Sequence, residues 1–403
     1  MKQTTIGILG GGQLGRMLAL AGYPLGLRFR FLEPAADAPA GHLAEHDRAG
    51  YDDSATLDRF AAGVDLISYE FENVPVAAAR RLAERVPVYP PPAALDAAQD
   101  RQAEKRFFQR LGVATPPFAP VGSRAELEAA VAQIGLPAVL KTRRLGYDGK
   151  GQFVLHAPAD IDRAWAALGG APLILEGFVA FRRELSILAA RGRAGEMVFY
   201  PLVENHHRAG ILRLSLAPAP ALTPALQAEA EQIAAQALEA LDYVGVLAIE
   251  LFEAERLETR GLSLVKSHEL QASGLQPPAS SLVVNEMAPR VHNSGHWTIE
   301  GAETSQFEQH LRAVLGLPLG SAALRGVSAM VNLIGVWPEQ AAVMAIPGTH
   351  LHLYGKAPRA GRKLGHVTVR ADDERQLQAR LAQVQTLVWQ SENEATEGTE
   401  NRA

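Results

Sequence analysis

The sequence predicts an α/β protein that begins with a doubly wound parallel sheet and continues with α+β segments. In the first hundred residues, short apolar runs alternate with helical patterns, which is typical of parallel strands joined by helices. A proline-rich stretch at 114–123 then reads as a linker to a second strand and helix series, because proline does not fit a helix interior. A length of 403 residues is typical of about two to three domains.

Each expected element follows from the local pattern of apolar residues and turn residues. The N-terminal strands are predicted at 5–10, 28–34, 65–71 and 86–91. A helix is predicted at 100–112, where Gly112 ends it.

The second series contains fewer clear boundaries but the same kinds of element. We expect strand, glycine-rich loop and strand over 136–155, two strands over 171–190, a helix over about 224–241, strands at 244–252 and 281–290, a helix at 305–316 and a terminal α+β piece. The long polar stretch 253–280 is expected to be an exposed excursion, and 391–403 a disordered tail.

Composition excludes several classes of protein. A formal net charge of −5 does not suggest a nucleic-acid partner. No apolar run is long enough to cross a membrane, and the N-terminus enters a strand without a signal-peptide pattern. The absence of cysteine excludes disulfides, thiolate catalysis and cysteine-bound metals, so we expect a cytoplasmic protein.

The first glycine-rich loop has the form G-x-G-x-x-G, through Gly10, Gly12 and Gly15. Between a strand and a helix, such a loop lets backbone N–H groups approach an anion. Glu33 follows at the spacing of a ribose-binding acid, so an NAD(P)-dependent oxidoreductase is one interpretation. The same loop could hold a sugar 5′-phosphate or be a plain tight turn.

A second glycine-rich loop, 146–152, favours a nucleotide triphosphate instead. Lys141 ends the strand before it, and Lys150 is followed by Gly151 rather than Ser or Thr, so the loop is not a Walker A motif. A mobile cover over phosphates, with Lys141 as a point charge, explains the pattern. A flexible surface hairpin is the alternative.

Two carboxylates on predicted strands indicate a magnesium site. Glu250 and Glu286 each follow an apolar run, where a carboxylate is costly unless it is paired or bound to metal. Asn285 adds an oxygen donor, and a salt bridge to arginine is the alternative role. In the polar loop that follows, Arg290 is a candidate for neutralising charge on a transferring phosphoryl group.

The chain resembles the ATP-grasp superfamily and, within it, the N5-carboxyaminoimidazole ribonucleotide synthetases of purine biosynthesis. The most specific matching stretches are "GYDGKGQ" and "NEMAPRVHNSGHWTIEGA". Others are "GILGGGQLGRML", "YEFENVP", "QDRQAEKRFF", "LEGFVAFRRELS", "YPLVENHHRAGILR" and "HLYGKAPRAGRKLGHVTV". The stretch between Glu250 and Asn285 is longer than the family pattern.

The resemblance implies an ATP-grasp fold in three parts with a short tail. These are an N-terminal pre-ATP-grasp domain at 1–103, a lid at 104–180, a C-terminal α+β domain at 181–390 and the tail at 391–403. The resemblance implies that ATP lies between the lid and the C-terminal domain. It also implies that the protein is a homodimer.

The resemblance also assigns residues by matching position. The implied ATP-binding residues are Arg101, Lys141, Gly146, Tyr147, Asp148, Gly149, Lys150, Gly151, Gln152, Glu176, Gly177, Phe178, Val179, Glu184, His207, Asn285 and Glu286. The implied magnesium ligands are Glu250 and Glu286. The implied substrate-binding residues are Gln13, Leu14, Glu72, Tyr147, Arg290, His292, Asn293, Ser294, Lys356 and Arg362. Lys141, Arg290 and His292 are the implied catalytic residues.

The implied reaction carboxylates 5-aminoimidazole ribonucleotide with bicarbonate. ATP and Mg²⁺, or Mn²⁺ in its place, activate bicarbonate as carboxyphosphate, and the carbamate product passes to a separate mutase. The proton from the amine goes to released phosphate or to His292. The alternatives are another ATP-grasp ligase acting through an acyl phosphate, an NAD(P)-dependent oxidoreductase, and a catalytically silent nucleotide-binding module. Under the resemblance no NAD(P) is expected, and the first glycine-rich loop faces the ribonucleotide.

Overall fold

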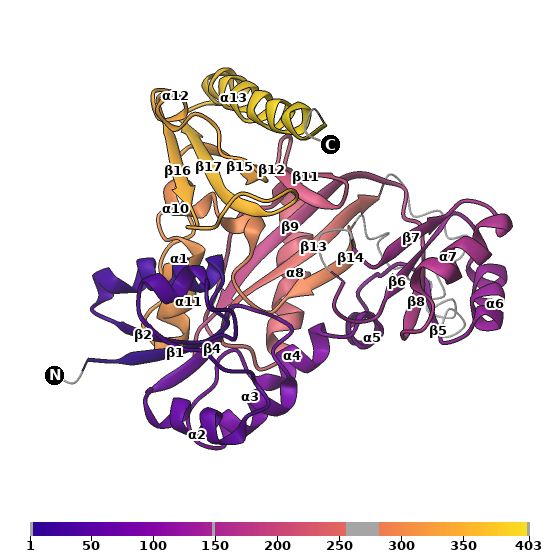
Figure 1. Ribbon diagram of the computed structural model, residues 1–403, viewed down its shortest axis with the longest axis horizontal. Coiled ribbons are helices and arrows are strands. Elements are labelled where there is room, and N and C mark those ends of the chain that lie inside the picture. Colours follow the sequence, from indigo (N-terminus) through magenta and orange to yellow (C-terminus); the bar gives the residue numbers. More distant parts are fainter. Residues whose placement is uncertain (1–2, 147–149, 255–281, 401–403) are drawn as a thin grey trace.

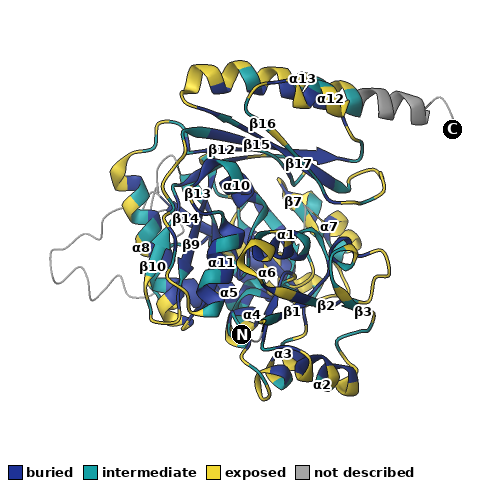
Figure 2. Cartoon of the chain, turned by 90° about the vertical axis from the view of Figure 1, so that its left-hand side faces the viewer, coloured by how far each residue is buried: buried dark blue, intermediate teal, exposed yellow. Residues whose placement is uncertain are grey.

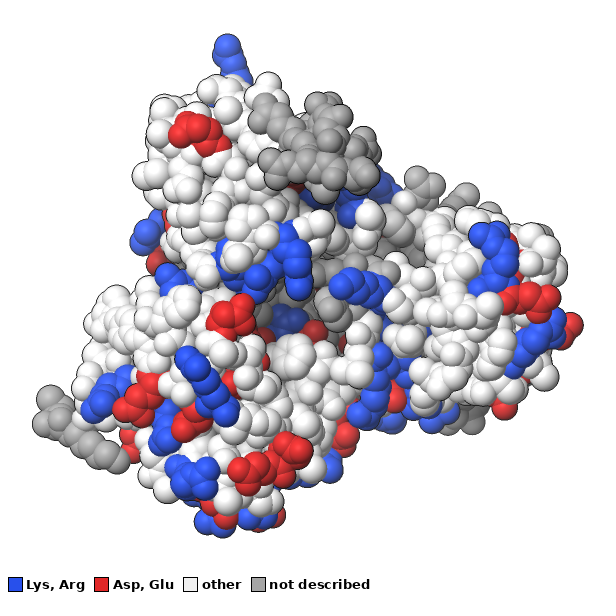
Figure 3. Space-filling model, viewed as in Figure 1, with Lys and Arg blue, Asp and Glu red and all other residues white. Residues whose placement is uncertain are grey.

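The computed structural model describes residues 3–146, 150–254 and 282–400, with the backbone alone for 393–400. Most of the predicted excursion at 253–280, and the predicted ligands Tyr147, Asp148 and Gly149, lie outside the described residues. The chain forms three lobes: the N-terminal domain, a small lobe of antiparallel strands, and a large C-terminal body (Figure 1). The space-filling view shows a central hollow between them (Figure 3).

The N-terminal domain is a parallel sheet covered on both faces, which confirms the doubly wound prediction. Its strand order is β3-β2-β1-β4. α1 covers one face, whereas α2 and α3 pack on the other. Its elements are β1 (Thr5–Leu9), α1 (Gln13–Gly22), β2 (Arg28–Leu32), β3 (Glu45–Asp47), α2 (Ser54–Ala62), β4 (Leu66–Tyr69), α3 (Val76–Ala83) and α4 (Pro92–Ala98).

One predicted strand of this domain is wrong. Residues 86–91 make a single parallel bridge, between Val88 and Ile67, instead of a strand. Three of these six residues are prolines, which have no N–H group to donate to a ladder.

The small lobe is a four-stranded antiparallel sheet in the order β5-β8-β6-β7. Helices α6 and α7 bury their apolar sides on it. The proline-rich linker is partly strand, because β5 lies at the sheet edge and Pro120 is tolerated there. The elements are β5 (Phe118–Val121), α6 (Arg124–Ile134), β6 (Ala138–Thr142), β7 (Gln152–Leu155), α7 (Ile161–Leu168) and β8 (Leu173–Gly177).

The body is built on a nine-stranded antiparallel sheet in the order β14-β13-β9-β11-β12-β15-β17-β16, with β10 paired to β9. Its helices and strands are α5 (Arg101–Arg110), β9 (Phe181–Arg191), β10 (Met197–Phe199), β11 (Val203–Arg208), β12 (Ile211–Ala217), α8 (Pro224–Ala240), β13 (Gly245–Ala254), β14 (Leu282–Ala288), α10 (Thr298–Gly301), α11 (Gln306–Leu315), β15 (Val327–Ile334), α12 (Gln340–Met344), β16 (Thr349–Leu353), β17 (Lys363–Ala371) and α13 (Glu374–Glu400).

Side chains along the central strands alternate between the two faces of the sheet, one facing the core under α8 and the other facing the site. In β13, Leu247, Ile249 and Leu251 pack on the α8 side. Val246 and Ala248 face the other way, toward α11 and the N-terminal domain. Glu250 has the same parity as this second pair and therefore faces the central hollow.

The C-terminal strands extend the central sheet, and α13 covers them (Figure 2). Residues 391–400 were expected to lack structure, yet they continue α13 to Glu400. Glu392 forms an ion pair with Arg213 of β12, which holds the helix against the sheet at this point. In the described part of the chain, no helix is both long and apolar enough to cross a membrane.

Candidate active site

A polar cavity opens where the three lobes meet, and arginine and lysine side chains surround the hollow (Figure 3). Residues far apart in the sequence line it. They come from the turn after β4, from the end of α4, from α5, from the loop after β6, and from β13, β14 and the loop after β14: Glu72, Asn73, Ala98, Gln99, Arg101, Glu104, Arg143, Arg144, Leu145, Gly146, Ala248, Glu250, Glu286, Met287, Ala288, Arg290 and His292.

The two predicted magnesium ligands lie directly opposite each other on β13 and β14. Loss of hydration and the neighbouring Glu286 carboxylate raise the pKa of Glu250 to about 7. The register shifts after Glu250, so Asn285 is an extra residue without a partner on β13. Two facing carboxylates, of which one resists ionisation, favour the binding of a further cation between them.

These residues fit a magnesium ion, which prefers one or two carboxylates completed by phosphate and water oxygens. The side-chain oxygen of Asn285 is buried, with no hydrogen-bond partner among the described residues, and is a further donor. Within those residues no cluster of three or more His, Cys, Asp or Glu side chains could hold a metal by itself. The arrangement therefore suits a metal that arrives with a nucleotide.

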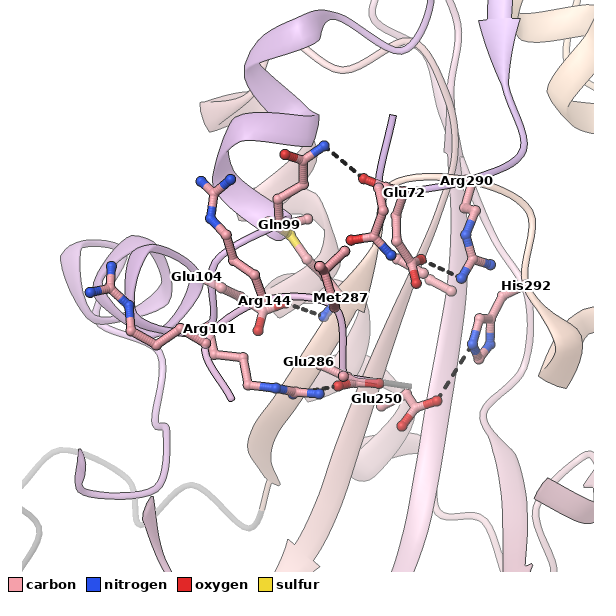
Figure 4. Close-up of a pocket in the computed structure, with 17 residues that line it drawn as sticks. Glu72, Gln99, Arg101, Glu104, Arg144, Glu250, Glu286, Met287, Arg290 and His292 are labelled. Carbon is pink, nitrogen blue, oxygen red and sulfur yellow. Dashed lines mark hydrogen bonds and ion pairs between the residues drawn. The ribbon is translucent and has the colours of Figure 1, made fainter. Parts of the chain in front are cut away.

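Helix α5 supplies a cation to this carboxylate pair. Arg101 Nη1 lies 2.7 Å from Glu286 Oε2. Loss of hydration would raise the pKa of Glu286, but Arg101 lowers it to about 2. Figure 4 shows Arg101 reaching across the cavity floor to Glu286, while Glu250 points toward His292.

The next turn of α5 holds the helix on β14. Glu104 Oε1 accepts a hydrogen bond from the Met287 N–H at 2.6 Å, and Lys105 donates to the Asn285 carbonyl. Burial raises the pKa of Glu104 to about 8. Position 104 lies inside α5, and the helix therefore spans the predicted boundary between the N-terminal domain and the lid.

Lys141 and Glu176 meet on adjacent strands of the small lobe. Lys141 Nζ lies 2.8 Å from Glu176 Oε2, and Lys105 Nζ lies 3.6 Å from Glu176 Oε1. Burial would raise the pKa of Glu176, yet the two lysines lower it to about 2. Burial lowers the pKa of Lys141, although Glu176 opposes this. Glu176 thus holds two cations beside the cavity.

The other predicted nucleotide residues lie around this cluster. Glu184 of β9 and His207 of β11 form a pair, with Glu184 Oε2 2.8 Å from Nδ1. Burial would lower the pKa of His207, but Glu184 raises it. Gly146 lines the cavity and Gln152 pairs with Lys141 across β6 and β7. Lys150 and Gly151 lie directly before β7. Gly177 ends β8, and Phe178 and Val179 lie between β8 and β9; Phe178 is half exposed.

The loop after β14 faces the N-terminal domain and carries four of the predicted substrate residues, of which Figure 4 labels Arg290 and His292. Arg290 forms an ion pair with Glu72, and His292 Nε2 lies 3.5 Å from Glu250 Oε1. Burial and Arg290 lower the pKa of His292 to about 3. Ser294 Oγ lies 2.8 Å from Ser186 Oγ. Asn293 Nδ2 is buried without a partner among the described residues.

The first glycine-rich loop was predicted to be an open anion site, but carboxylates of the protein already bind some of its N–H groups. Glu70 accepts hydrogen bonds from the Gly12 and Gly15 N–H groups at 2.8 and 3.2 Å, and Glu33 accepts one from Gly11 at 3.2 Å. A Cβ at Gly10, whose φ is +100°, would lie 2.7 Å from Glu70. The glycines therefore make room for a carboxylate of the protein itself.

Two of the remaining predicted substrate residues contact the N-terminal domain. Lys356 Nζ lies 2.5 Å from Gln13 Oε1, across 343 positions of sequence. Arg362 lies 3.7 Å from Asp37, also on the N-terminal domain. The Leu14 side chain belongs to the core, so only its backbone can face a ligand.

Sequence reasoning missed Glu70, Glu104 and Lys105. Glu104 and Lys105 are three and four positions after Arg101, which places all three on one face of a helix. That spacing could have identified two of them. Glu70 had no such signal, because its partners lie 55 and 58 positions earlier in the chain.

Three family models match successive parts of the chain. They are a ribonucleotide synthetase preATP-grasp domain at residues 1–99, an ATP-grasp domain at 106–307, and a phosphoribosylaminoimidazole carboxylase C-terminal domain at 328–380. The ATP-grasp model alone spans half of the chain, from α5 to α11.

Known proteins match nearly the whole chain. The N5-carboxyaminoimidazole ribonucleotide synthase of Pseudomonas aeruginosa is 55% identical over 383 residues, covering 95% of this chain and 99% of its own. The crystal structure of the Thermus thermophilus synthetase superimposes with a TM-score of 0.86 at 58% identity, covering 95% and 98%. An Aspergillus clavatus synthase, solved with ADP and 5-aminoimidazole ribonucleotide, gives a TM-score of 0.84 at 30% identity, covering 96% and 99%. The chain therefore belongs to the N5-carboxyaminoimidazole ribonucleotide synthetase family of ATP-grasp enzymes.

Proposed function

We propose that this protein carboxylates 5-aminoimidazole ribonucleotide with bicarbonate, using ATP and Mg²⁺, as a step of purine biosynthesis. The observation that carries the proposal is the contact between His292 and Glu250, at 3.5 Å. Glu250 belongs to the carboxylate pair suited to a nucleotide-bound metal, and His292 to the loop facing the ribonucleotide domain. One cavity therefore serves both substrates.

The nucleotide lies between the small lobe, which acts as a lid, and the body. In this proposal Lys141 and the 146–152 loop hold the phosphates, the segment 176–179 lies beside adenine, and Glu184 takes the ribose hydroxyls. Arg101 and His207 also contact the nucleotide. Lys141, Glu184, Arg101 and His207 each have a partner in an ion pair, which keeps the side chain in position before ATP arrives.

Glu250, Glu286 and Asn285 hold the metal, which neutralises charge on the phosphates when it is bound. Glu250 and Glu286 repel each other when both are ionised, as the raised pKa of Glu250 indicates. A bound cation would offset this repulsion. Lys141 and Arg290 add positive charge around the transferring phosphoryl group.

The ribonucleotide lies on the N-terminal domain side. Glu70 accepts hydrogen bonds from the Gly12 and Gly15 N–H groups, and within the described residues no acceptor binds the Gln13 and Leu14 N–H groups between them. These two amides suit the 5′-phosphate, with Lys356 and Arg362 as its counter-ions. Glu72, Tyr147, Arg290, His292, Asn293 and Ser294 surround the aminoimidazole and the bicarbonate.

The reaction proceeds by activating a poor electrophile. A bicarbonate oxygen takes the γ-phosphoryl group of ATP, giving ADP and carboxyphosphate. Carboxyphosphate releases phosphate and CO₂ in place, and the 5-amino nitrogen bonds to the carbon as its proton leaves. His292 Nδ1 accepts a hydrogen bond from the Ser294 N–H, and its pKa of about 3 makes it a weak base. Released phosphate is therefore the better proton acceptor, and His292 orients the reactants.

The assay that tests this function is ADP release with and without 5-aminoimidazole ribonucleotide, in the presence of bicarbonate and Mg²⁺. We expect the ribonucleotide to stimulate release, and replacement of bicarbonate by formate to abolish the stimulation. Stimulation by formate instead would favour a transformylase of the same superfamily. We further propose that the protein is a cytoplasmic homodimer that passes its carbamate to a separate mutase, with domain boundaries near 103, 180 and 390.

A further inference from the structure

The side chain of Gln306, at the start of α11, binds the backbone of His292 on both sides. Its Oε1 accepts a hydrogen bond from the His292 N–H at 2.8 Å, and its Nε2 donates to the His292 carbonyl at 2.7 Å. Gln306 is fully buried. These are the two bonds that a neighbouring β-strand would provide. From them we infer that Gln306 is a positioning residue for the reaction of this site.

His292 requires such a partner because its chain segment has left the sheet. It follows β14 in an extended conformation, with φ −128° and ψ 154°, and comes directly before the short turn 293–295. A backbone N–H and carbonyl left without partners in this buried segment would be costly. The Gln306 amide supplies both, so it fixes where the His292 side chain begins.

The second N–H and the backbone of Gln306 are fixed as well. Nε2 lies 3.3 Å from His296 Nδ1, and the Gln306 N–H donates to Thr298 Oγ1 at 2.9 Å. Thr298 Oγ1 in turn donates to the Gly295 carbonyl at 2.6 Å. Both ends of the loop are therefore tied to one point of α11, and the amide has little freedom to shift.

The inference rests on the proposed function, because it acts through residues placed on the ribonucleotide side. His292 contacts Glu250, and Arg290, two positions earlier, contacts Glu72. A displacement of the His292 backbone moves both side chains away from their partners. The nucleotide residues Lys141 and Glu184 lie on other strands and keep their own partners.

The same helix contains a matched control. Gln309 is also fully buried, donates to the Gly320 carbonyl at 2.7 Å and accepts from the Gly320 N–H at 2.8 Å. Gly320 belongs to the connection between α11 and β15, and is not among the residues that line the cavity. Replacing either glutamine by methionine removes a pair of bonds to the backbone of one residue and keeps a similar side-chain volume. Gln306→Met also removes the longer contact with His296 Nδ1, at 3.3 Å.

The experiment compares Gln306→Met with Gln309→Met in thermal unfolding, in steady-state kinetics and in equilibrium binding of the ribonucleotide and of ADP. We expect similar falls in Tm. In Gln306→Met we expect kcat/KM for the ribonucleotide to fall about 10- to 100-fold, because small misplacements of reacting groups have effects of that size. Its KM for ATP and its binding of ADP should stay within about twofold, and Gln309→Met should match the wild type in these three functional quantities.

Equal kinetic losses in the two variants, or no loss in Gln306→Met, would overturn the inference. If Gln306→Met does not fold, Gln306→Glu carries the comparison at a pH where its carboxyl group is ionised, since it then retains the acceptor for the His292 N–H and loses the donor. A loss in the Glu variant supports the inference, and wild-type kinetics contradict it. Failure of the proposed function is distinguishable, because the wild-type protein would then neither bind the ribonucleotide nor release ADP in response to it.

Discussion

His310 connects the N-terminal domain to the body, and its replacement by asparagine is expected to make the free energy of unfolding less dependent on pH. His310 Nε2 lies 2.8 Å from Ser68 Oγ on β4, and Nδ1 accepts a hydrogen bond from the Val246 N–H of β13 at 3.1 Å. β4 leads to the turn that carries Glu72, and β13 carries Glu250. The histidine therefore connects the two sides of the cavity.

The magnitude follows from the pKa of this side chain. Burial lowers the pKa of His310 from 6.5 to about 4. Below pH 6.5 the unfolded chain takes up a proton that the folded protein does not, so stability falls as the pH falls and levels off below about 4. Integration gives a loss of roughly 2 kcal/mol at pH 5 and about 3 kcal/mol below pH 4.

The assay is urea unfolding of the wild type and His310→Asn, followed by circular dichroism at pH values of about 7.5 and 5. Asparagine can still accept from the Val246 N–H but does not titrate. The other buried histidines contribute equally to both proteins, so they cancel in the difference. We expect the stability advantage of the wild type to shrink by about 2 kcal/mol at the lower pH. Parallel pH dependence in the two proteins would refute the reasoning.

Three further predictions concern the active site. Glu286→Gln should abolish ADP release without unfolding the protein, and near-normal turnover would remove Glu286 from the metal site. Asp100→Asn keeps the cap of α5 but weakens the ion pair with Arg143, whose two bonds are 3.1 and 2.7 Å long. Because Arg143 lines the cavity, KM for ATP should rise about tenfold. The control Asp53→Asn, at the cap of α2, should leave KM for ATP unchanged. Chelation of Mg²⁺ should stop ADP release and leave Tm unchanged, and a large fall in Tm would indicate a structural metal instead.

The parts of this molecule that the sequence could predict are those in which one local pattern determines the outcome. Glu250 and Glu286 were recognisable because each interrupts an apolar run, where a carboxylate needs a function. Their strands then pair in register, which no local pattern specifies. The family resemblance supplied the remaining site residues by position, and their roles stay predictions.

Contacts between distant residues explain what the sequence could not reveal. The first glycine-rich loop has the pattern of an anion site, but whether the anion is a ligand or Glu70 depends on how β1 and β4 meet. Likewise, α13 covers the sheet as far as Val388 and Glu392 pairs with Arg213, a contact between distant residues that the polar composition of the tail does not reveal.

The measurement that tests the central claim most directly is ADP release by the purified, folded protein with Mg²⁺, ATP and bicarbonate, with and without 5-aminoimidazole ribonucleotide. The account predicts slow release that the ribonucleotide stimulates strongly, with one carbamate formed for each ADP. A folded protein that binds ATP but shows no such stimulation would contradict it.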